Sequence, residues 1–331
     1  ADYPRFRTLL EKALPLADAN DYYVQSLTLP SIRAMDAFLD GRYREALDHA
    51  QLALHAVEGQ KVSGIFIPYE AAYILADVYL EFGEEEKSLA VVDKYLPLAI
   101  HAQQWPWVVG LLAKSSLVRV QQGRINEALN LIRQAREYVS GTQFNPLITY
   151  PIDTHEIFAR IPLNDFERIM ELIHRLPNNP ATQTILIALE ARKNPNEAVK
   201  ILSSMPENTY HQKFGKNLML AECLVSNPPM ALKYLQEAVD IAVQHGYFRA
   251  FVNMTSELKS LVLDLAQKNP TVYMENLAKA IRQQSQAVQG TPVGMENPLT
   301  KRELDILRRL ATGLPISQIA ASLHISNNTI K

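Results

Sequence analysis

The sequence has very little cysteine and no segment that could cross a membrane. Its single cysteine, Cys223, cannot form an internal disulfide bond, as expected of a protein in a reducing cytoplasm. No apolar run approaches the roughly 20 residues that a membrane-spanning helix needs. The first ten residues, ADYPRFRTLL, show no signal-peptide pattern. These absences predict a cytoplasmic protein with no membrane partner.

Strong net charge and catalytic motifs are also missing. The formal net charge of −2 over 331 residues argues neither for a generally basic nucleic-acid binder nor for a membrane-surface protein. Charge is uneven, however: residues 295–331 carry +2 and the remainder −4. We find no Ser–His–Asp, Cys–His or paired-carboxylate spacing, no His/Cys/carboxylate cluster with metal-ligand spacing, and no phosphate-binding G-x-x-x-x-G-K-[ST] loop. We therefore predict that the chain is not an enzyme and holds no metal and no cofactor.

Three internal repeats indicate a tandem array of helix hairpins. The stretches FLDGRYREALDHAQLAL, YLEFGEEEKSLAVVDKY and RVQQGRINEALNLIRQA each contain a glycine, at 41, 83 and 123. A small residue lies seven positions before each glycine and another five positions after it. These six residues are Ala34, Ala46, Ala76, Ser88, Ser116 and Ala128. Small side chains let two helices approach closely, and glycine suits the left-handed turn between them. The spacing predicts an all-α repeat array.

The helical pattern continues beyond these three repeats. Two degenerate copies surround Ala198 and Ala231, and the second has another alanine, Ala238, seven residues after Ala231. Between the third repeat and these copies, IPLNDFERIMELIHRLP predicts a helix with one apolar face. Its members are Phe166, Ile169, Met170 and Ile173. We expect the array to reach about residue 268 and a further helix to follow at 270–288; no alternating pattern predicts a sheet.

The last 43 residues or so differ in composition from the array. Gln, Gly and Pro are frequent around 289–298, which predicts a linker. Residues 299–331 then carry a capping box, Thr300 with Glu303, followed by two short amphipathic helices and the start of a third at Ser326. Two short helices before a helix that opens on small polar groups are typical of a helix-turn-helix DNA reader. The predicted DNA-binding residues are Ser326, Asn327, Asn328, Thr329 and Lys331.

This C-terminal segment, LTKRELDILRRLATGLPISQIAASLHISNNTIK, resembles the DNA-binding domain of LuxR-type regulators. It matches the landmarks L-T-x-R-E, L-x-x-x-x-G, I-A, L-x-I-S and T-[VI]-K in order. The resemblance implies that promoter DNA is a partner. It also implies that the recognition helix and a closing helix continue past Lys331. We therefore expect the helix-turn-helix of this chain to be truncated and to bind DNA poorly as it stands.

The repeats resemble the tetratricopeptide (TPR) family, with Gly41, Tyr43, Ala46 and Ala53 on that family's preferred positions. An array of this kind followed by a linker and a LuxR-type end resembles the large regulators of the MalT type. That resemblance implies a domain of residues 1–288 that senses an effector. It also implies that an ATP-binding domain, if the family organisation holds, precedes Ala1.

Four aromatic residues are the candidate contacts for an effector. Tyr69 and Tyr73 lie on the first helix of the second repeat, and Trp105 and Trp107 flank a proline at the start of the third. Such rings can stack on a flat-faced ligand, and they can equally fill the seams between hairpins. Both interpretations remain open from the sequence.

Two functions fit these patterns. In the first, the array binds a small-molecule or protein effector and thereby controls homo-oligomerisation and promoter binding by a transcription regulator. The alternative is a TPR-type scaffold for protein–protein interaction with no DNA-binding output.

Overall fold

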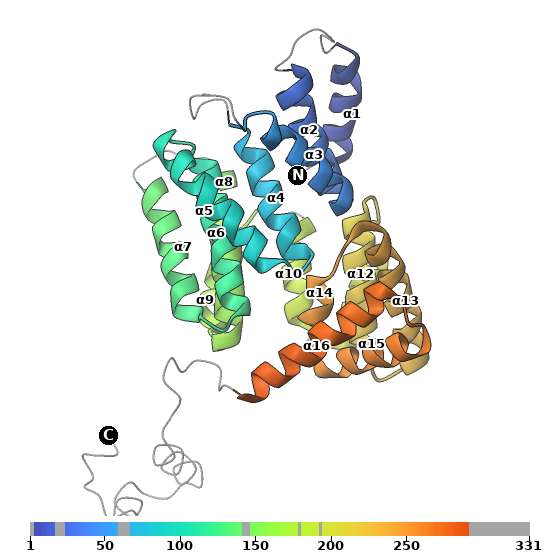
Figure 1. Ribbon diagram of the computed structural model, residues 1–331. Helices are drawn as coiled ribbons and strands as arrows, with labels where there is room; N and C mark the ends of the chain where they lie inside the picture. The colour runs from blue at the N-terminus through green and yellow to red at the C-terminus, as the bar shows by residue number, and fades with distance from the viewer. Residues whose placement is uncertain are drawn as a thin grey trace, which may run out of the picture. The chain divides into compact units, whose positions relative to one another are not determined.

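Helices are the regular secondary structure of the residues that the structure describes. The computed structural model describes residues 3–16, 24–58, 67–140, 146–177, 180–191 and 194–290, and no strand occurs among them (Figure 1). This confirms the predicted all-α fold class. Residues up to Gln284 form one compact unit; of a second unit, which starts at Ser285, the described part is the end of the last helix.

Sixteen α-helices and three short helical turns occur among the described residues. The α-helices are α1 (Tyr3–Ala13), α2 (Leu29–Asp40), α3 (Tyr43–His55), α4 (Tyr69–Glu81), α5 (Glu85–His101), α6 (Trp105–Gln121), α7 (Ile125–Val139), α8 (Pro146–Arg160), α9 (Phe166–Arg175), α10 (Pro180–Ala191), α11 (Pro195–Ser204), α12 (Tyr210–Cys223), α13 (Pro228–His245), α14 (Arg249–Val252), α15 (Ser256–Lys268) and α16 (Val272–Gly290). The short turns are η1 (Leu14–Leu16), η2 (Val24–Thr28) and η4 (Ile161–Leu163).

The hairpins form where the glycine spacing predicts them. Helix α2 packs on α3, α4 on α5, and α6 on α7. The glycine between the two helices of each pair has a positive φ angle: 90° at Gly41, 75° at Gly83 and 73° at Gly123. A residue with a Cβ is strained in this left-handed region, so glycine is favoured there.

The small residues of the repeats lie where the helices of each hairpin meet. All six have no exposed surface: Ala34, Ala46, Ala76, Ser88, Ser116 and Ala128. Ala198, Ala231 and Ala238 of the degenerate copies are also fully buried. The close approach of the helices, which the sequence predicts, is therefore confirmed.

One part of the sequence-based prediction is wrong, at helix α9. Ile169 and Ile173 are buried as predicted, but Phe166 and Met170 are 47% and 43% exposed. The buried stripe instead includes Leu172 and continues to Leu176, where it meets apolar residues of α8 and α10. Both sets of residues have helical spacing, and the neighbouring helices decide which set is buried.

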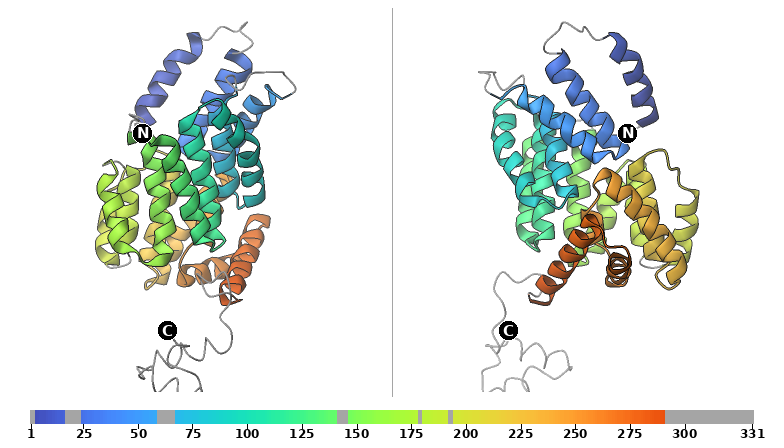
Figure 2. Two further views of the ribbon diagram at one scale, coloured as in Figure 1. Left: turned by 90° about the vertical axis from the view of Figure 1, so that its left-hand side faces the viewer. Right: turned by 45° about the vertical axis from the view of Figure 1, so that its right-hand side comes forward.

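The array returns to its own beginning. Helices α12, α13 and α14 contact α2, α3 and α4 respectively, and the views of Figures 1 and 2 show these segments side by side. One continuous hydrophobic cluster joins α2–α5 to α12–α16. At this closing contact the ring of Tyr43 lies 4.6 Å from that of Tyr247, and the backbone N–H of Phe248 donates to the carbonyl of Glu81 at 3.0 Å.

The closing contact explains why two of the glycine turns tolerate no side chain. A Cβ on Gly41 would collide with the Tyr247 hydroxyl and lie 2.6 Å from the backbone nitrogen of His211. At Gly83 it would lie 2.9 Å from the ring of Phe248. By contrast, a Cβ at Gly123 would meet nothing within 4 Å. Local turn geometry and distant packing both require glycine in the first two repeats.

None of the described helices is both long enough and apolar enough to cross a lipid bilayer.

Candidate functional site

The array contains a partly open cavity, the inner cavity. Its volume is about 490 Å³, within the range of small-molecule sites. Apolar walls come from helices that lie far apart in the sequence, from α2 to α12. Among these wall residues are Leu39, Tyr150, Phe158, Ile185, Leu202 and Met219. Polar side chains also line it, mainly on α8, on α10 and at the start of α12. These are Thr154, Thr184, Thr209, His211, Gln212 and Lys216.

Lys216 is the one charged side chain among the described residues that line this cavity. Its ammonium group pairs with the Glu207 carboxylate at 2.7 Å. It also donates to the carbonyl oxygens of Ser203 at 3.4 Å and Met205 at 3.3 Å. Three acceptors therefore occupy the donors of this group, and its charge is balanced within the wall.

His211 connects the cavity to the first repeat. Its Nδ1 lies 3.0 Å from the hydroxyl of Tyr43, which follows the Gly41 turn. Burial lowers the pKa of His211 and raises that of Tyr43 well above its usual value, so both groups are uncharged at neutral pH. Since Nδ1 is engaged, Nε2 is the ring nitrogen left for a ligand.

Gly215 gives the cavity its width along α12. It lies inside this helix, one turn after His211, and lines the cavity. A Cβ placed there would meet no heavy atom within 4 Å. Glycine is unfavourable in a helix interior, and no close contact requires it here. The consequence of Gly215 is therefore open space in the cavity.

Buried ionic groups occupy the interior beside the first helices. The Lys114 ammonium lies 2.8 Å from the Asp77 carboxylate, and their side chains are 7% and 11% exposed. Burial opposes the charge on Lys114, but the Asp77 carboxylate and the Tyr73 phenol outweigh it and raise the pKa of Lys114. For Asp77, burial is likewise outweighed by Lys114, and the pKa is lowered. Both groups are therefore charged at neutral pH.

A second ion pair and a neutral histidine complete this interior network. Arg249 donates through Nε to the Glu81 carboxylate at 3.0 Å, across the closing contact. His155 is buried, with Nδ1 2.7 Å from the carbonyl of Pro151. Burial, reinforced by the positive charge of Lys114, lowers the pKa of His155 to about 3. The interior thus accepts charges in pairs and keeps its histidines neutral.

The four aromatic residues that the sequence offers as effector contacts lie in or beside packed seams. Tyr69 is 2% exposed and shares a hydrophobic cluster with Trp105 and Trp107. The ring of Tyr73 lies 6.1 Å from that of Trp107, and Trp105 stacks on Tyr138 at 5.7 Å. None of the four is among the lining residues of the inner cavity. Their role as effector contacts stays a prediction.

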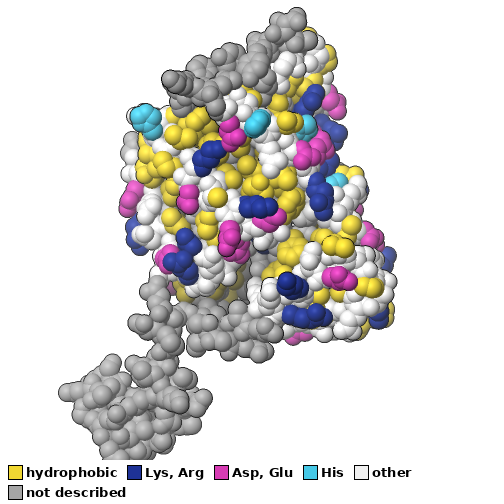
Figure 3. All heavy atoms as spheres, in the orientation of Figure 1, with side chains coloured by type: hydrophobic (Ala, Val, Ile, Leu, Met, Phe, Trp, Pro, Cys, Tyr) yellow, Lys and Arg dark blue, Asp and Glu magenta, His cyan; other side chains and the backbone are white. Residues whose placement is uncertain are grey.

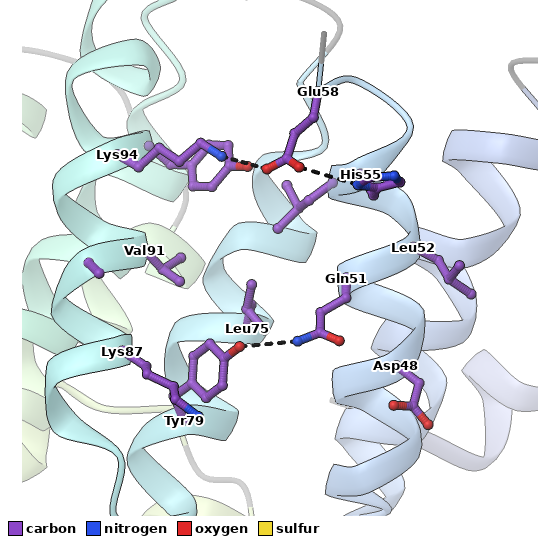
Figure 4. A pocket seen from close by; sticks show the side chains of 13 residues that line it. Asp48, Gln51, Leu52, His55, Glu58, Leu75, Tyr79, Lys87, Val91 and Lys94 are labelled. Atoms are coloured by element: carbon purple, nitrogen blue, oxygen red, sulfur yellow. Dashed lines mark hydrogen bonds and ion pairs between the residues drawn. The ribbon is translucent and has the colours of Figure 1, made fainter.

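A second hollow, the outer groove, lies between α3 and α5 on the outside of the array. Its volume is about 870 Å³, and its floor includes Leu75, Val91 and Tyr95. Figure 3 shows apolar side chains gathered in the middle of this face, with charged groups among and around them. Figure 4 shows α3 and α5 as its walls and α4 between them.

Polar side chains bridge the outer groove. Glu58 lies 2.6 Å from the Lys94 ammonium and 3.3 Å from Nδ1 of His55, while the Gln51 amide donates to the Tyr79 hydroxyl at 3.1 Å (Figure 4). The exposed fractions of the Lys94 and Glu58 side chains are 52% and 47%. A partner in this groove would meet charged groups that water already solvates.

The predicted DNA-binding residues lie outside the described residues. These are Ser326, Asn327, Asn328, Thr329 and Lys331. Within the described part of the chain, no group of three or more His, Cys, Asp or Glu side chains could hold a metal ion.

Sequence reasoning missed the inner cavity and the closing contact. The lining residues of the cavity come from segments as distant as Leu39 and Met219, and no periodic pattern connects them. One local signal was available: Gly215 stands inside an otherwise helical stretch, where glycine carries an energetic cost.

Two protein-family models match the chain. Residues 8–268 match the family model of the MalT-like TPR region. Residues 297–331 match that of the bacterial regulatory proteins of the luxR family. Neither the curated proteins nor the solved structures compared with the chain include a match.

Proposed function

We propose that the array of this chain, which belongs to the MalT-like TPR family, senses a small-molecule effector in the inner cavity. The match of residues 297–331 to the luxR family of regulatory proteins supports a role in transcription regulation. In this proposal residues 1–288 form the sensor, 289–298 the linker and 299–331 the DNA reader. Effector binding controls homo-oligomerisation and, through it, binding to promoter DNA. A LuxR-type helix-turn-helix implies promoter DNA as a partner, and neither matched family is catalytic.

The observation that carries this proposal is the position of His211. It lines the cavity, and its other ring nitrogen is bonded to Tyr43 in the first hairpin. An effector that contacts His211 therefore acts directly on the contact between the beginning and the end of the array. A ligand that binds better to one arrangement of this contact shifts the population toward it.

The test combines a ligand screen with a DNA-binding assay. A thermal-shift screen of the chain against small metabolites should yield an effector that stabilises the array by about 2.7 kcal/mol at 100 times its dissociation constant. The same effector should change the affinity of the intact regulator for promoter DNA, measured by fluorescence anisotropy at several salt concentrations, because contacts to phosphate are salt-dependent. An effector that stabilises the array but leaves oligomeric state and DNA affinity unchanged contradicts the proposed control.

The outer groove favours a second candidate function, that of a protein-interaction scaffold. Lys87 and Lys94 form one wall, and Asp48 and Glu58 belong to the opposite wall, so a peptide with both charges would find complementary sides. In this case the double variant Lys87→Glu/Lys94→Glu should lose a partner protein while retaining the response to small molecules. If the variant keeps its partner protein but loses the response to small molecules, the sensor function is favoured.

A further inference from the structure

We infer that the inner cavity selects an uncharged, largely apolar small molecule with one hydrogen-bonding group at the end formed by His211 and Gln212. This inference rests on the proposed sensor function and specifies the chemistry of its effector.

The charge of the wall carries the first step. Among the described lining residues Lys216 alone is charged, and Glu207 with two carbonyl oxygens already surrounds its ammonium group. Desolvation by its packed neighbours lowers the pKa of His211, so its ring is neutral at pH 7 although part of the residue is exposed. A charged ligand would lose its hydration in the cavity and gain no counter-charge, which disfavours it strongly.

The hydrogen-bonding groups carry the second step. The hydroxyl of Tyr3 donates to Asp36 at 3.1 Å, and that of Thr209 accepts from the backbone N–H of Gln212 at 3.1 Å. The side-chain oxygen of Gln212 accepts from the backbone N–H of Asn208 at 2.8 Å. On α8 the Tyr150 hydroxyl bonds to Thr154 and Thr182, and Thr184 on α10 has a partner of its own. At the start of α12 the Gln212 amide nitrogen and His211 Nε2 are left for a ligand.

The number of free polar groups limits the ligand. One carbonyl, hydroxyl or amide can be satisfied by His211 and Gln212 together. A molecule with many hydroxyl groups, such as a sugar, would bury several of them without partners, and each such group is costly. The apolar wall from Leu39, Phe158, Ile185 and Met219 instead suits an aliphatic or aromatic body.

Two matched fluorescent probes test the inference on the whole chain. N-phenyl-1-naphthylamine is uncharged, and 8-anilino-1-naphthalenesulfonate carries a sulfonate on the same ring system. The uncharged probe should bind at least tenfold more tightly than the sulfonate, and sucrose should not displace it. If the sulfonate binds as tightly, or sucrose competes, the inference on ligand class is overturned, whereas the cavity can still be the effector site.

Variants of α12 locate the probe. Gly215→Leu should fill the open space and weaken binding of the uncharged probe at least tenfold, with an unchanged or higher Tm because glycine disfavours the helix. Lys213→Leu adds the same side chain at an exposed position of α12 and should bind the probe normally. Met219→Trp narrows the cavity independently and should act like Gly215→Leu. Unchanged binding in both cavity variants would place the probe elsewhere and overturn the inference.

Failure of this inference can be distinguished from failure of the proposed function. The probes report ligand class and location alone. The dependence of promoter binding on an effector tests the regulatory function separately, and it can succeed with a charged effector.

Discussion

The Lys114–Asp77 pair inside the array is buried, whereas the Lys94–Glu58 pair of the outer groove is exposed. The two sets of contacts have similar geometry: 2.8 Å between Lys114 and Asp77 in the interior, and 2.6 Å between Lys94 and Glu58 at the groove. Their exposed fractions differ several-fold. The comparison teaches that burial, more than the length of an ion pair, decides how much the protein depends on it.

The largest expected effect comes from breaking the interior pair. Lys114→Met leaves the Asp77 carboxylate buried without its counter-charge and should lower the free energy of unfolding by about 3–5 kcal/mol. Urea denaturation followed by circular dichroism measures this change. The double variant Asp77→Asn/Lys114→Met removes both charges and should recover part of the loss. If the single variant is as stable as the parent chain, the interior is better hydrated than its burial indicates.

The next effect separates a glycine turn at the closing contact from one that faces open space. Gly41→Ala introduces a Cβ into a left-handed turn, at about 1–2 kcal/mol, and also against Tyr247 and His211, at about 1–3 kcal/mol more. Gly123→Ala meets the backbone penalty alone. Urea denaturation measures both losses of stability. Equal losses in the two variants would mean that Tyr247 and His211 can move away from the added Cβ at little energetic cost.

Acidification should destabilise the interior through its neutral histidines. Unfolded histidine gains a proton below about pH 6.5, whereas the pKa of His155 in the folded chain is about 3. Between these values the unfolded state binds more protons, so stability falls as pH falls. From pH 7 to pH 5 the loss from His155 should be about 2 kcal/mol. Burial also lowers the pKa values of His211 and His245, and both act in the same direction.

The histidine of the outer groove supplies the matched control for this pH dependence. His155→Gln should flatten the decrease of Tm between pH 7 and pH 5. His55→Gln removes an exposed pair with Glu58 and should change this decrease much less, because exposed pairs contribute less than about 1 kcal/mol. The same slope in both variants would show that His155 does not cause the acid sensitivity.

The smallest effect is expected at the outer groove itself. Lys94→Met breaks the exposed pair with Glu58 and should change the free energy of unfolding by less than about 1 kcal/mol. Salt should weaken this small contribution further. A loss comparable to that of Lys114→Met would contradict the role assigned to burial.

The repeat pattern predicted local structure well because its causes are local. A glycine with positive φ and small residues at fixed offsets are properties of one hairpin, and Gly41, Ala46 and Ser88 all lie where that pattern requires. The buried face of α9 was only half predicted. Phe166 and Leu172 are both apolar, and neighbouring helices decide which of them is covered.

The candidate site was harder to predict because its parts are distant in the sequence. Tyr43 and His211 are 168 residues apart, and nothing in either residue type predicts that the two side chains are in contact. Aromatic composition directed attention to Tyr69 and Trp105, which pack among apolar neighbours. Gly215 was visible in the sequence, but its meaning depends on the empty space that α8, α10 and α11 leave beside it.

The closing contact changes how the array gains its stability. An open repeat array behaves as a one-dimensional chain, whose end units can unfold while the middle stays folded. Here Tyr43 and Tyr247 belong to one hydrophobic cluster, so the α2–α3 hairpin and the segment between α13 and α14 stabilise each other. We therefore expect the array to unfold more cooperatively than an open one. Folding must also bring together residues that are 168 positions apart in the sequence, a loop closure that an open array does not need.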